Sequence, residues 1–312
     1  MSEQRWTSDD IPDQTGRTVI VTGANSGLGL AATESLARHG ATVILAVRNE
    51  AKGRAAVARI RGRQPAADVE VRLLDLADLD SVRRFSEALH TDAVNLDVLI
   101  NNAGVMMPPR SLSPQGNETQ FAGNHLGHFA LTGLLLDLFH DPHGDSRVVT
   151  VSSSLHKRGS IHFDDLTGER SYSASHFYAQ SKFANVLFGL ELDRRLRAAG
   201  SPIRSVLAHP GYSATNLQTA GPTGLMKILG RIGNVVVAQS VEKGALPELY
   251  GATSPDALGG QFFGPDGRGE MKGYPTVVQP IPSATDLQTA RRLWEVSERL
   301  TGVTYDLPAA SA

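Results

Sequence analysis

The chain has 312 residues, 41% of them hydrophobic and 20% charged, a composition that indicates neither a disordered nor a fibrous protein. Its formal net charge is −2 and it has no long basic run, which disfavours a nucleic-acid partner. The chain has no cysteine, so disulfides, thiolate metal sites and a cysteine nucleophile are excluded. It also has neither an apolar signal core near its start nor the roughly 18 consecutive apolar residues of a membrane span. We therefore expect a cytoplasmic protein without a membrane span.

A glycine-rich turn follows the first predicted strand. The β-branched run at 19–21 predicts a buried strand, and a helical pattern begins at Leu30. Between them the glycines have the spacing G-x-x-x-G-x-G, which differs from the commonest dinucleotide fingerprint. Many glycine loops are only turns, but a strand, a glycine turn and a helix start in this order form an anion site. The turn residues concerned are Gly23, Asn25, Ser26, Gly27, Leu28 and Gly29.

The second predicted strand, 41–47, ends at Arg48. In a Rossmann half, an acidic residue at this tip holds the 2′-hydroxyl of NAD, whereas an arginine suits the 2′-phosphate of NADP. No carboxylate is present at the tip, and the planar, always-charged guanidinium of Arg48 matches a phosphate well. The alternative is a solvated surface arginine. The sequence therefore favours NADP over NAD.

Helices and strands continue to alternate through the first hundred residues. We predict helices at 30–39, 50–61 and 80–89 and strands at 69–74 and 96–100. The third strand ends at Asp75, whose carboxylate either accepts a hydrogen bond from an adenine amino group or serves as a charge at the start of the next helix. Short connections between alternating elements predict one parallel, doubly wound sheet with helices on both faces, a single-domain α/β Rossmann fold.

The second half of the chain continues the pattern. The predicted helices are 117–139 (interrupted at 124–128), 176–198, 240–250 and 285–300, and the predicted strands are 147–151, 203–208 and 260–264. With no composition break, we expect one domain over 1–312. We divide it into a core at 17–251, a substrate lid at 212–240 and a C-terminal extension at 252–312.

Three side chains suited to acid–base chemistry converge on the carboxyl edge of this sheet. Tyr178 and Lys182 are four residues apart on a predicted helix, so they project from one face. An ammonium close to a phenol favours the phenolate, so we expect Lys182 to lower the pKa of Tyr178 toward neutrality. Ser153 follows the strand 147–151, where its hydroxyl would hold a substrate oxygen. These groups would hold a carbonyl while a nicotinamide delivers hydride to its carbon.

Together these features resemble the short-chain dehydrogenase/reductase family in its single-domain branch, over about residues 17–251. The markers, in chain order, are Thr22-Gly23-x-x-x-Gly27-x-Gly29, Asp75, Asn101-Asn102-Ala103-Gly104, Asn124, Ser153, Tyr178-x-x-x-Lys182, and Pro210-Gly211 with Thr215. The runs 46–49, 124–129 and 181–185 are most similar to the retinol-dehydrogenase-like group, which commonly prefers NADP. Membrane-bound relatives in that group carry an N-terminal apolar anchor that is not present here, so retinoid chemistry at a membrane is not implied.

The resemblance implies a role for each marker. Tyr178 is expected to be the proton donor and acceptor, Ser153 to orient the substrate oxygen, and Lys182 to bind the nicotinamide ribose and lower the Tyr178 pKa. Asn124 is expected to interrupt its helix and hold a water that relays protons through Lys182. The cofactor contacts beyond the glycine turn and Arg48 are expected from Asp75, Leu76, Asn102, Ala103, Gly104, Tyr178, Lys182, Pro210, Gly211 and Thr215. Relatives often pair through the helices that carry Asn124 and Tyr178, which implies a homodimer or homotetramer.

Several alternatives remain open from the sequence. Ser152 or Ser154 replaces Ser153 as the active-site serine if the strand register is shifted. The histidines and aspartates of the loop 155–175 lack metal-ligand spacing, and we expect no metal. The apolar run 225–229 is expected to close over an apolar substrate, with a core or dimer-facing helix as the alternative.

We therefore expect an NADP(H)-dependent oxidoreductase that interconverts an apolar aldehyde or ketone, as its small-molecule partner, with the corresponding alcohol. The rival from another class is a nucleotide-binding sensor or scaffold without turnover, against which the intact acid–base set argues. An epimerase or dehydratase of the longer branch is disfavoured by the glycine spacing and by the short C-terminal portion.

Overall fold

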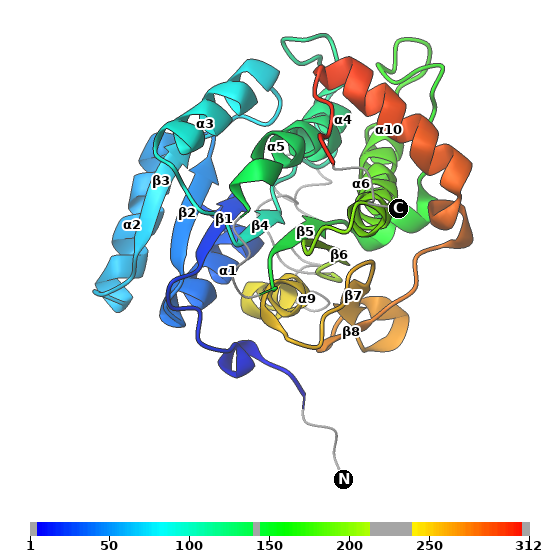
Figure 1. The fold of residues 1–312 in the computed structure, drawn as a ribbon. Helices are drawn as coiled ribbons and strands as arrows, with labels where there is room; N and C mark the ends of the chain where they lie inside the picture. Colours follow the sequence, from blue (N-terminus) through cyan, green and yellow to red (C-terminus); the bar gives the residue numbers. More distant parts are fainter. Residues whose placement is uncertain (1–4, 140–143, 213–238, 308–312) are drawn as a thin grey trace.

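The computed structural model describes residues 5–139, 144–212 and 239–307, which form one eight-stranded sheet flanked by helices (Figure 1). The strand order is β3-β2-β1-β4-β5-β6-β7-β8, with β1 to β7 parallel and β8 antiparallel to β7. The strands are β1 Thr18–Thr22, β2 Thr42–Val47, β3 Val69–Leu73, β4 Val98–Asn101, β5 Arg147–Val151, β6 Arg204–Ala208, β7 Phe262–Pro265 and β8 Pro275–Val277.

Helices cover both faces of the sheet (Figure 1). On one face lie α1 Gly27–Arg38, α2 Glu50–Arg63 and α9 Val241–Thr253. On the other lie α3 Leu79–Thr91, α5 Gly127–Leu135, α6 Ala174–Ala198 and α10 Leu287–Thr301. The predicted doubly wound Rossmann fold is confirmed.

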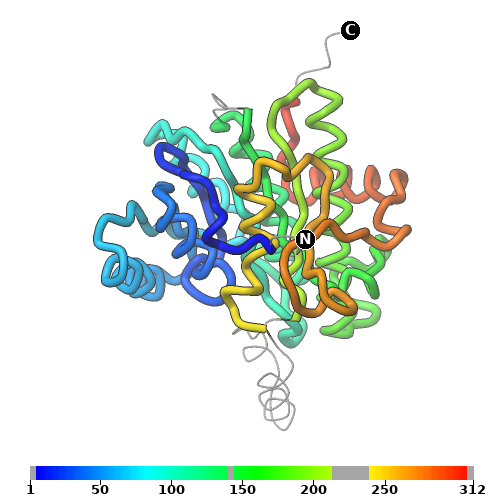
Figure 2. Tube along the Cα trace, turned by 90° about the horizontal axis from the view of Figure 1, so that it is seen from below, coloured from blue at the N-terminus to red at the C-terminus, as the bar shows by residue number. Residues whose placement is uncertain are grey.

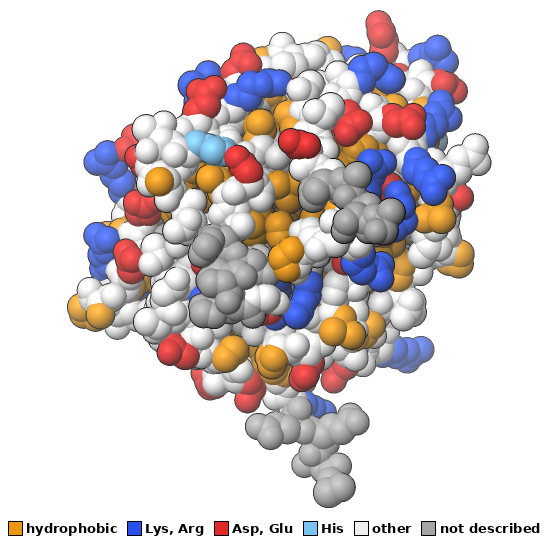
Figure 3. Space-filling model, in the orientation of Figure 1, with side chains coloured by type: hydrophobic (Ala, Val, Ile, Leu, Met, Phe, Trp, Pro, Cys, Tyr) orange, Lys and Arg blue, Asp and Glu red, His pale blue; other side chains and the backbone are white. Residues whose placement is uncertain are grey.

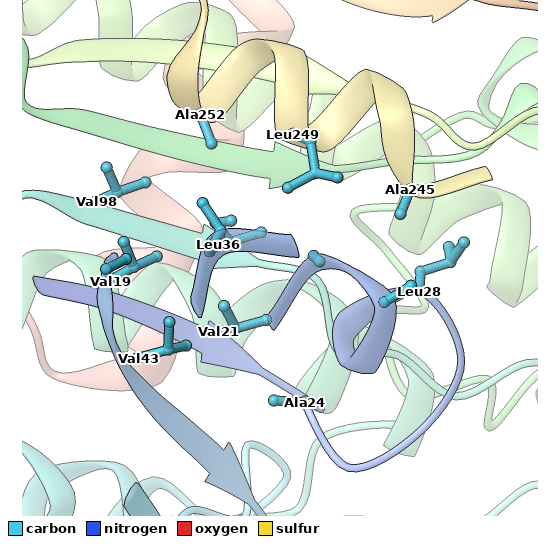
Figure 4. Packing of buried hydrophobic residues seen from close by; sticks show 14 of the residues in the cluster. Val19, Val21, Ala24, Leu28, Leu36, Val43, Val98, Ala245, Leu249 and Ala252 are labelled. Carbon is cyan, nitrogen blue, oxygen red and sulfur yellow. The ribbon is translucent and has the colours of Figure 1, made fainter. Parts of the chain in front are cut away.

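The core on the α1 and α9 face is made of small aliphatic side chains (Figure 4). Val19 and Val21 of β1 lie beneath Leu36 of α1, and Leu249 and Ala252 of α9 point toward the same layer (Figure 4). All five are buried, and the central strands are buried on both faces, which explains their nearly continuous apolar sequences. This packing holds the start of α1 against the end of β1, where the glycine turn lies.

The opposite face contains an aromatic cluster through which α10 packs on α5 and α6. Trp294 of α10 lies edge-on to Phe129 of α5, with ring centroids 5.0 Å apart. The ring of Tyr305 is tilted against that of Trp294, with centroids 4.5 Å apart, and its hydroxyl donates a 2.7 Å hydrogen bond to the carbonyl of Phe129. The chain's own C-terminal helix therefore covers part of α5 and α6, and a dimer using that surface would first have to displace it. The expected oligomer stays a prediction.

The predicted helix 117–139 is divided into unlike segments. A short α4, Thr119–Phe121, leads into the π-helical turn Ala122–Leu126, and α5 follows. The amide of Gly127 donates to the carbonyl of Ala122, a π-type bond that widens the turn around Asn124. The predicted interruption is therefore real, and it places Asn124 at the irregular point of the helix.

Other differences from the sequence prediction lie in three separate parts of the chain. The strand β8 is not among the predicted strands. The segment 155–175, which we expect to be a loop, begins within a 3₁₀ helix, Ser154–Arg158. The N-terminal segment runs to α9 (Figure 2). There the ring of Trp6 contacts that of Tyr250 edge-on, with centroids 5.2 Å apart. Most of the predicted lid, including its apolar run 225–229 and Thr215, lies outside the described residues.

The face shown in Figure 3 carries acidic and basic side chains interspersed around smaller hydrophobic areas. Within the described ranges, no helix has both the length and the apolar character needed to cross a membrane.

Candidate active site

The carboxyl ends of β1 and β4 are joined by Thr22. The Thr22 hydroxyl oxygen accepts hydrogen bonds from the backbone amides of Asn102 and Ala103, both at 2.9 Å. The side chain of Asn102 in turn donates a 2.7 Å hydrogen bond to the Thr22 carbonyl. These bonds hold the loop after β4 against the glycine turn after β1, so two sequence motifs about 80 residues apart become one surface.

Two glycines of the turn, Gly23 and Gly29, lie so close to neighbouring atoms that a side chain at either position would collide with them. A Cβ added at Gly29 would lie 2.5 Å from the Asn102 side-chain nitrogen and 2.8 Å from the Gly23 carbonyl. Gly23 has a φ of +69°, and a Cβ there would lie 3.0 Å from that of Ala103. The helix α1 begins at Gly27, and Ser26 makes no side-chain capping bond, so the first amides of the helix remain available to an anion. We call this surface, formed by the glycine turn 23–29 and the loop 102–104, the cradle. Its close backbone approach and its available amides fit a dinucleotide phosphate.

The predicted adenosine contacts lie along the same edge. Arg48 is exposed at the end of β2 and makes no hydrogen bond or ion pair with any described residue. One oxygen of Asp75 accepts from the amide of Ala77 at 3.0 Å, which stabilises the turn after β3, while Asp78 caps α3. Leu76 is buried next to the π-helical turn, where a Cβ on Gly127 would collide with its carbonyl.

Asn124, Lys182 and Gly104 meet at the centre of the edge. A Cβ at Gly104 would lie 3.3 Å from Asn124 Oδ1 and 3.4 Å from Lys182 Nζ. The Asn124 side chain accepts from the amide of Val105 at 2.8 Å and donates to its carbonyl and to the Ser181 hydroxyl, both at 2.9 Å. Lys182 Nζ donates to the Val151 carbonyl at 3.1 Å.

Tyr178 and Ser153 form the other part of the site. Tyr178 is buried on α6, one turn before Lys182, whose Nζ lies 6.0 Å from the tyrosine ring centroid. Its side chain is close enough to that of Ser153 for the serine hydroxyl to oppose the rise in the Tyr178 pKa. Ser152 points elsewhere, because its hydroxyl donates to the Lys182 carbonyl at 2.8 Å. Of Ser152 and Ser153, only the latter affects the Tyr178 pKa, while Ser154 begins the 3₁₀ helix that follows.

The pKa values of the pair differ from the sequence expectation. Burial raises the pKa of Tyr178 to about 12, and the hydrogen bond from Ser153 opposes this only in part. Burial also lowers the pKa of Lys182 to about 8, against the attraction of Glu248. The prediction that Lys182 lowers the Tyr178 pKa is therefore wrong for this structure, because loss of water disfavours the charged form of both groups.

The structure also shows a group that the sequence did not indicate. Glu270, from the β7–β8 connection, accepts from Lys157 at 2.7 Å and from His209 at 3.0 Å. These bonds hold the pKa of Glu270 well down, at about 2, and they tie the loop after β5 to the loop after β6. Gly211, with a φ of +62°, follows Pro210 in that second loop, and its amide donates to His209 at 3.2 Å. No local pattern links positions so distant in sequence.

A second missed residue is Glu248, a buried carboxyl on α9. Its oxygens have no hydrogen-bond partner among the described residues, and burial raises its pKa to about 8. Lys182 opposes this shift. The two buried groups therefore influence each other through a low-dielectric interior. An acidic residue within a predicted helix usually indicates an exposed position, so the sequence contains no signal for it.

Two histidines of the loop 155–175 contact neighbouring groups of the protein itself. His156 is buried and its Nδ1 hydrogen-bonds the Ser153 carbonyl at 2.7 Å, whereas His162 lies 3.3 Å from the Ser160 hydroxyl. Among residues 5–139, 144–212 and 239–307, no group of three or more histidine, aspartate or glutamate side chains is arranged to hold a metal ion.

Comparison with known proteins agrees with this geometry. The sequence profile of the short chain dehydrogenase family matches residues 17–224. Human retinol dehydrogenase 14 is 40% identical over 304 residues, covering 92% of this chain and 87% of that protein. Mouse polyprenol dehydrogenase is 38% identical over 298 residues, covering 94% and 86%. A crystal structure described as a putative uncharacterized protein from Mycobacterium paratuberculosis is 46% identical, with a TM-score of 0.81 and coverage of 97% and 100%.

The chain belongs to the short-chain dehydrogenase family, and it is similar to the retinol dehydrogenases within it. It is accordingly an NAD(P)-dependent oxidoreductase that acts on alcohols or carbonyls. The residues at the carboxyl edge fit the cofactor class, since a side chain at Gly29 would collide with Asn102 and Gly23 and one at Gly23 would be strained.

A substitution in the cradle provides the first prediction. Gly29→Ala places a methyl group against Asn102 and Gly23, so we expect NADPH affinity to fall by about tenfold or more, measured by fluorescence titration. Gly62→Ala is the control, because a Cβ there meets nothing within 4 Å and the position lies within α2. Equal NADPH affinity in wild type and Gly29→Ala would contradict this assignment of the cradle.

Proposed function

We propose that this protein uses NADPH to reduce an apolar aldehyde or ketone to the alcohol, with Tyr178 as the proton donor. The observation that carries the proposal is the meeting of the two parts of the site. The glycine cradle ends at Gly104, Asn124 and Lys182, and Tyr178 with its Ser153 partner lies one helical turn from Lys182. The residues that would hold the nicotinamide end of the cofactor are therefore next to Tyr178 and Ser153, which would hold the carbonyl oxygen.

Arg48 supports the choice of NADP. It stands exposed at the end of β2, and its guanidinium has no described partner to neutralise it. A free guanidinium at this position suits the 2′-phosphate, which adds negative charge and several acceptors. The first residues of α2 supply no arginine or lysine closer than Lys52, so Arg48 is the group on which the preference is proposed to depend.

The protonation state of Tyr178 supports the direction of reduction. With a pKa of about 12, the phenol keeps its proton at neutral pH, as a proton donor must. The carbonyl carbon would receive its hydride from NADPH when the cofactor is bound in the cradle. As the carbon–oxygen double bond becomes a single bond, the Tyr178 hydroxyl gives its proton to the oxygen, and Ser153 keeps that oxygen in place. Lys182, positioned with Asn124, returns a proton to Tyr178.

Apolar residues near the site support an apolar substrate. The loop that follows Gly104 continues through Val105, Met106 and Met107, all half-buried. Two of the similar proteins are named for retinol and polyprenol, both apolar alcohols. A sensor or scaffold without turnover is the rival function, and the presence of a complete Ser153, Tyr178 and Lys182 set argues against it, because nucleotide binding alone does not need it.

Removing the Tyr178 hydroxyl tests the proposal. Tyr178→Phe should bind NADPH as wild type does but lose carbonyl reduction by about a hundredfold or more, because no group replaces the proton donor. The control is Tyr250→Phe, which removes a hydroxyl from α9 near the N-terminal segment and should leave activity unchanged. NADPH oxidation that survives in Tyr178→Phe would exclude the proposed acid.

Arg48→Asp tests the cofactor preference. The substituted carboxylate repels a 2′-phosphate and accepts from a ribose 2′-hydroxyl, so the ratio of kcat/KM with NADPH to that with NADH should fall by about a hundredfold. Arg63→Asp makes the same charge change at the far end of α2 and serves as control. If both variants keep the wild-type ratio, the NADP assignment has no basis at Arg48.

The pH dependence follows from the two shifted pKa values. Tyr178 stays protonated up to about 12, whereas Lys182 loses its charge above about 8. The kcat for reduction should therefore be constant below about pH 8 and fall above it, as Lys182 can no longer return a proton. Oxidation needs a deprotonated acceptor, so its kcat should rise with pH. A reductive kcat that rises through this range would contradict the assignment.

A further inference from the structure

His128 is buried and links Thr22, at the end of β1, to the backbone of Asn124, a link that we call the bridge. Its Nε2 lies 2.9 Å from the Thr22 hydroxyl oxygen, and its Nδ1 lies 3.0 Å from the Asn124 backbone carbonyl. The residue is 1% exposed at the start of α5, one turn after Asn124. Neither the nucleotide cradle nor the acid–base set contains this residue.

The partners of His128 define its tautomer. A carbonyl oxygen only accepts, so Nδ1 carries the proton that is shared with Asn124. Burial and nearby Lys182 lower the pKa of His128 to about 4, so the ring is neutral near pH 7 and Nε2 is an acceptor. The single proton of the Thr22 hydroxyl has two acceptors within reach, Nε2 at 2.9 Å and the Ile100 carbonyl at 3.3 Å, and we assign it to the shorter contact. The Thr22 oxygen accepts from the amides of Asn102 and Ala103. Each polar atom of the bridge has a partner with the right role.

The bridge connects two parts of the site whose relative position matters. At one end, Thr22 holds the loop that carries Asn102 to Gly104. At the other, Asn124 holds Val105 and Ser181, and its Oδ1 lies near Lys182. The π-helical turn around Asn124 lacks the regular α-helical bonding that would otherwise define its position.

We propose that His128 is a positioning residue: it fixes the Asn124 carbonyl at a defined position relative to Thr22 of β1, so that Asn124 and Lys182 return protons to Tyr178 efficiently. This rests on the proposed function for its kinetic consequence. The structural part, a neutral histidine that donates through Nδ1 and accepts through Nε2, is independent of it.

Two amide substitutions separate the two ends of the bridge. The side-chain nitrogen of asparagine occupies nearly the place of Nδ1, so His128→Asn keeps the bond to Asn124 and gives up that to Thr22. The side-chain oxygen of glutamine reaches nearly the place of Nε2, so His128→Gln keeps the Thr22 bond and gives up that to Asn124. Both variants replace a buried imidazole by an amide, so a general loss of packing affects both.

His125 provides the matched control. It is a buried, neutral histidine on the same π-helical turn, but its Nε2 lies 2.8 Å from the hydroxyl of Ser297 on α10. Its ring packs against Phe121 and Phe188, away from β1. His125→Asn and His125→Gln should lower the melting temperature without separating from each other in kcat.

The kinetic test compares kcat for carbonyl reduction at saturating NADPH, together with NADPH affinity and melting temperature. We expect His128→Gln to lower kcat by about tenfold to a hundredfold, as displaced catalytic groups do, with NADPH affinity close to wild type. His128→Asn should restore kcat to within about threefold of wild type, because the donor to Asn124 is retained. Equal losses of kcat in the two variants, or full activity in both, would overturn the proposal.

The second test needs no activity. Histidine ¹⁵N spectra of the whole protein, with the His128 signals identified by their loss in His128→Asn, should show Nδ1 protonated and Nε2 unprotonated from neutral pH down to about 5. Exchange of the Val105 amide, which is bonded to Asn124, should accelerate in His128→Gln but not in His125→Gln. The opposite tautomer, or unchanged exchange, would overturn the bridge. If wild type reduces no carbonyl while these results hold, the proposed function fails and the bridge stands.

Discussion

The arrangement of the site depends on the hydrogen bonds made by the hydroxyl of Thr22. Parallel strands bring the ends of β1 and β4 to the same edge, but register alone does not position the loops beyond them. The two amide bonds to the Thr22 oxygen, and the bond from Asn102 to the Thr22 carbonyl, do so. They place Gly23 and Gly29 against Asn102 and Ala103 with no space for a side chain. Both walls of the cradle are therefore held by one residue, Thr22.

Burial determines the chemistry of the neighbouring groups. Tyr178 and Lys182 lie on α6, which packs against the sheet on one side and α10 on the other, and both side chains are removed from water. The same desolvation that stabilises the packed helix favours the neutral forms of both residues. A neutral phenol suits a proton donor. The environment therefore supports the proposed reductive direction, which the order of residues in the sequence does not indicate.

Much of the fold could be predicted because its signals are local. Buried runs such as 41–47 indicate parallel strands, and the glycine turn after β1 indicates a close backbone approach. Which serine faces Tyr178 could not be predicted. Neighbouring residues on a strand point to opposite faces, and the sequence does not show whether Ser152 or Ser153 points to the site.

The features that could not be predicted are contacts between distant segments or effects of burial. Nothing near Glu270 in the sequence indicates that it bonds Lys157 and His209, and nothing near Trp294 indicates that it packs on Phe129. The rise in the Tyr178 pKa was missed because a four-residue spacing shows which groups are close but not how much water surrounds them. His128 was within reach, since it follows Asn124 by one helical turn, but its second partner on β1 was not.

The most direct test of the central claim is to follow the hydride itself. The protein is incubated with NADPH that carries deuterium at both C4 positions and with the carbonyl that it turns over fastest among aliphatic, aromatic and steroid-like compounds, and the alcohol is analysed by mass spectrometry. Our account predicts an alcohol with one deuterium on its carbinol carbon, and none incorporated there from heavy water when ordinary NADPH is used. An alcohol free of deuterium after reaction with the labelled cofactor would contradict direct hydride transfer at this site.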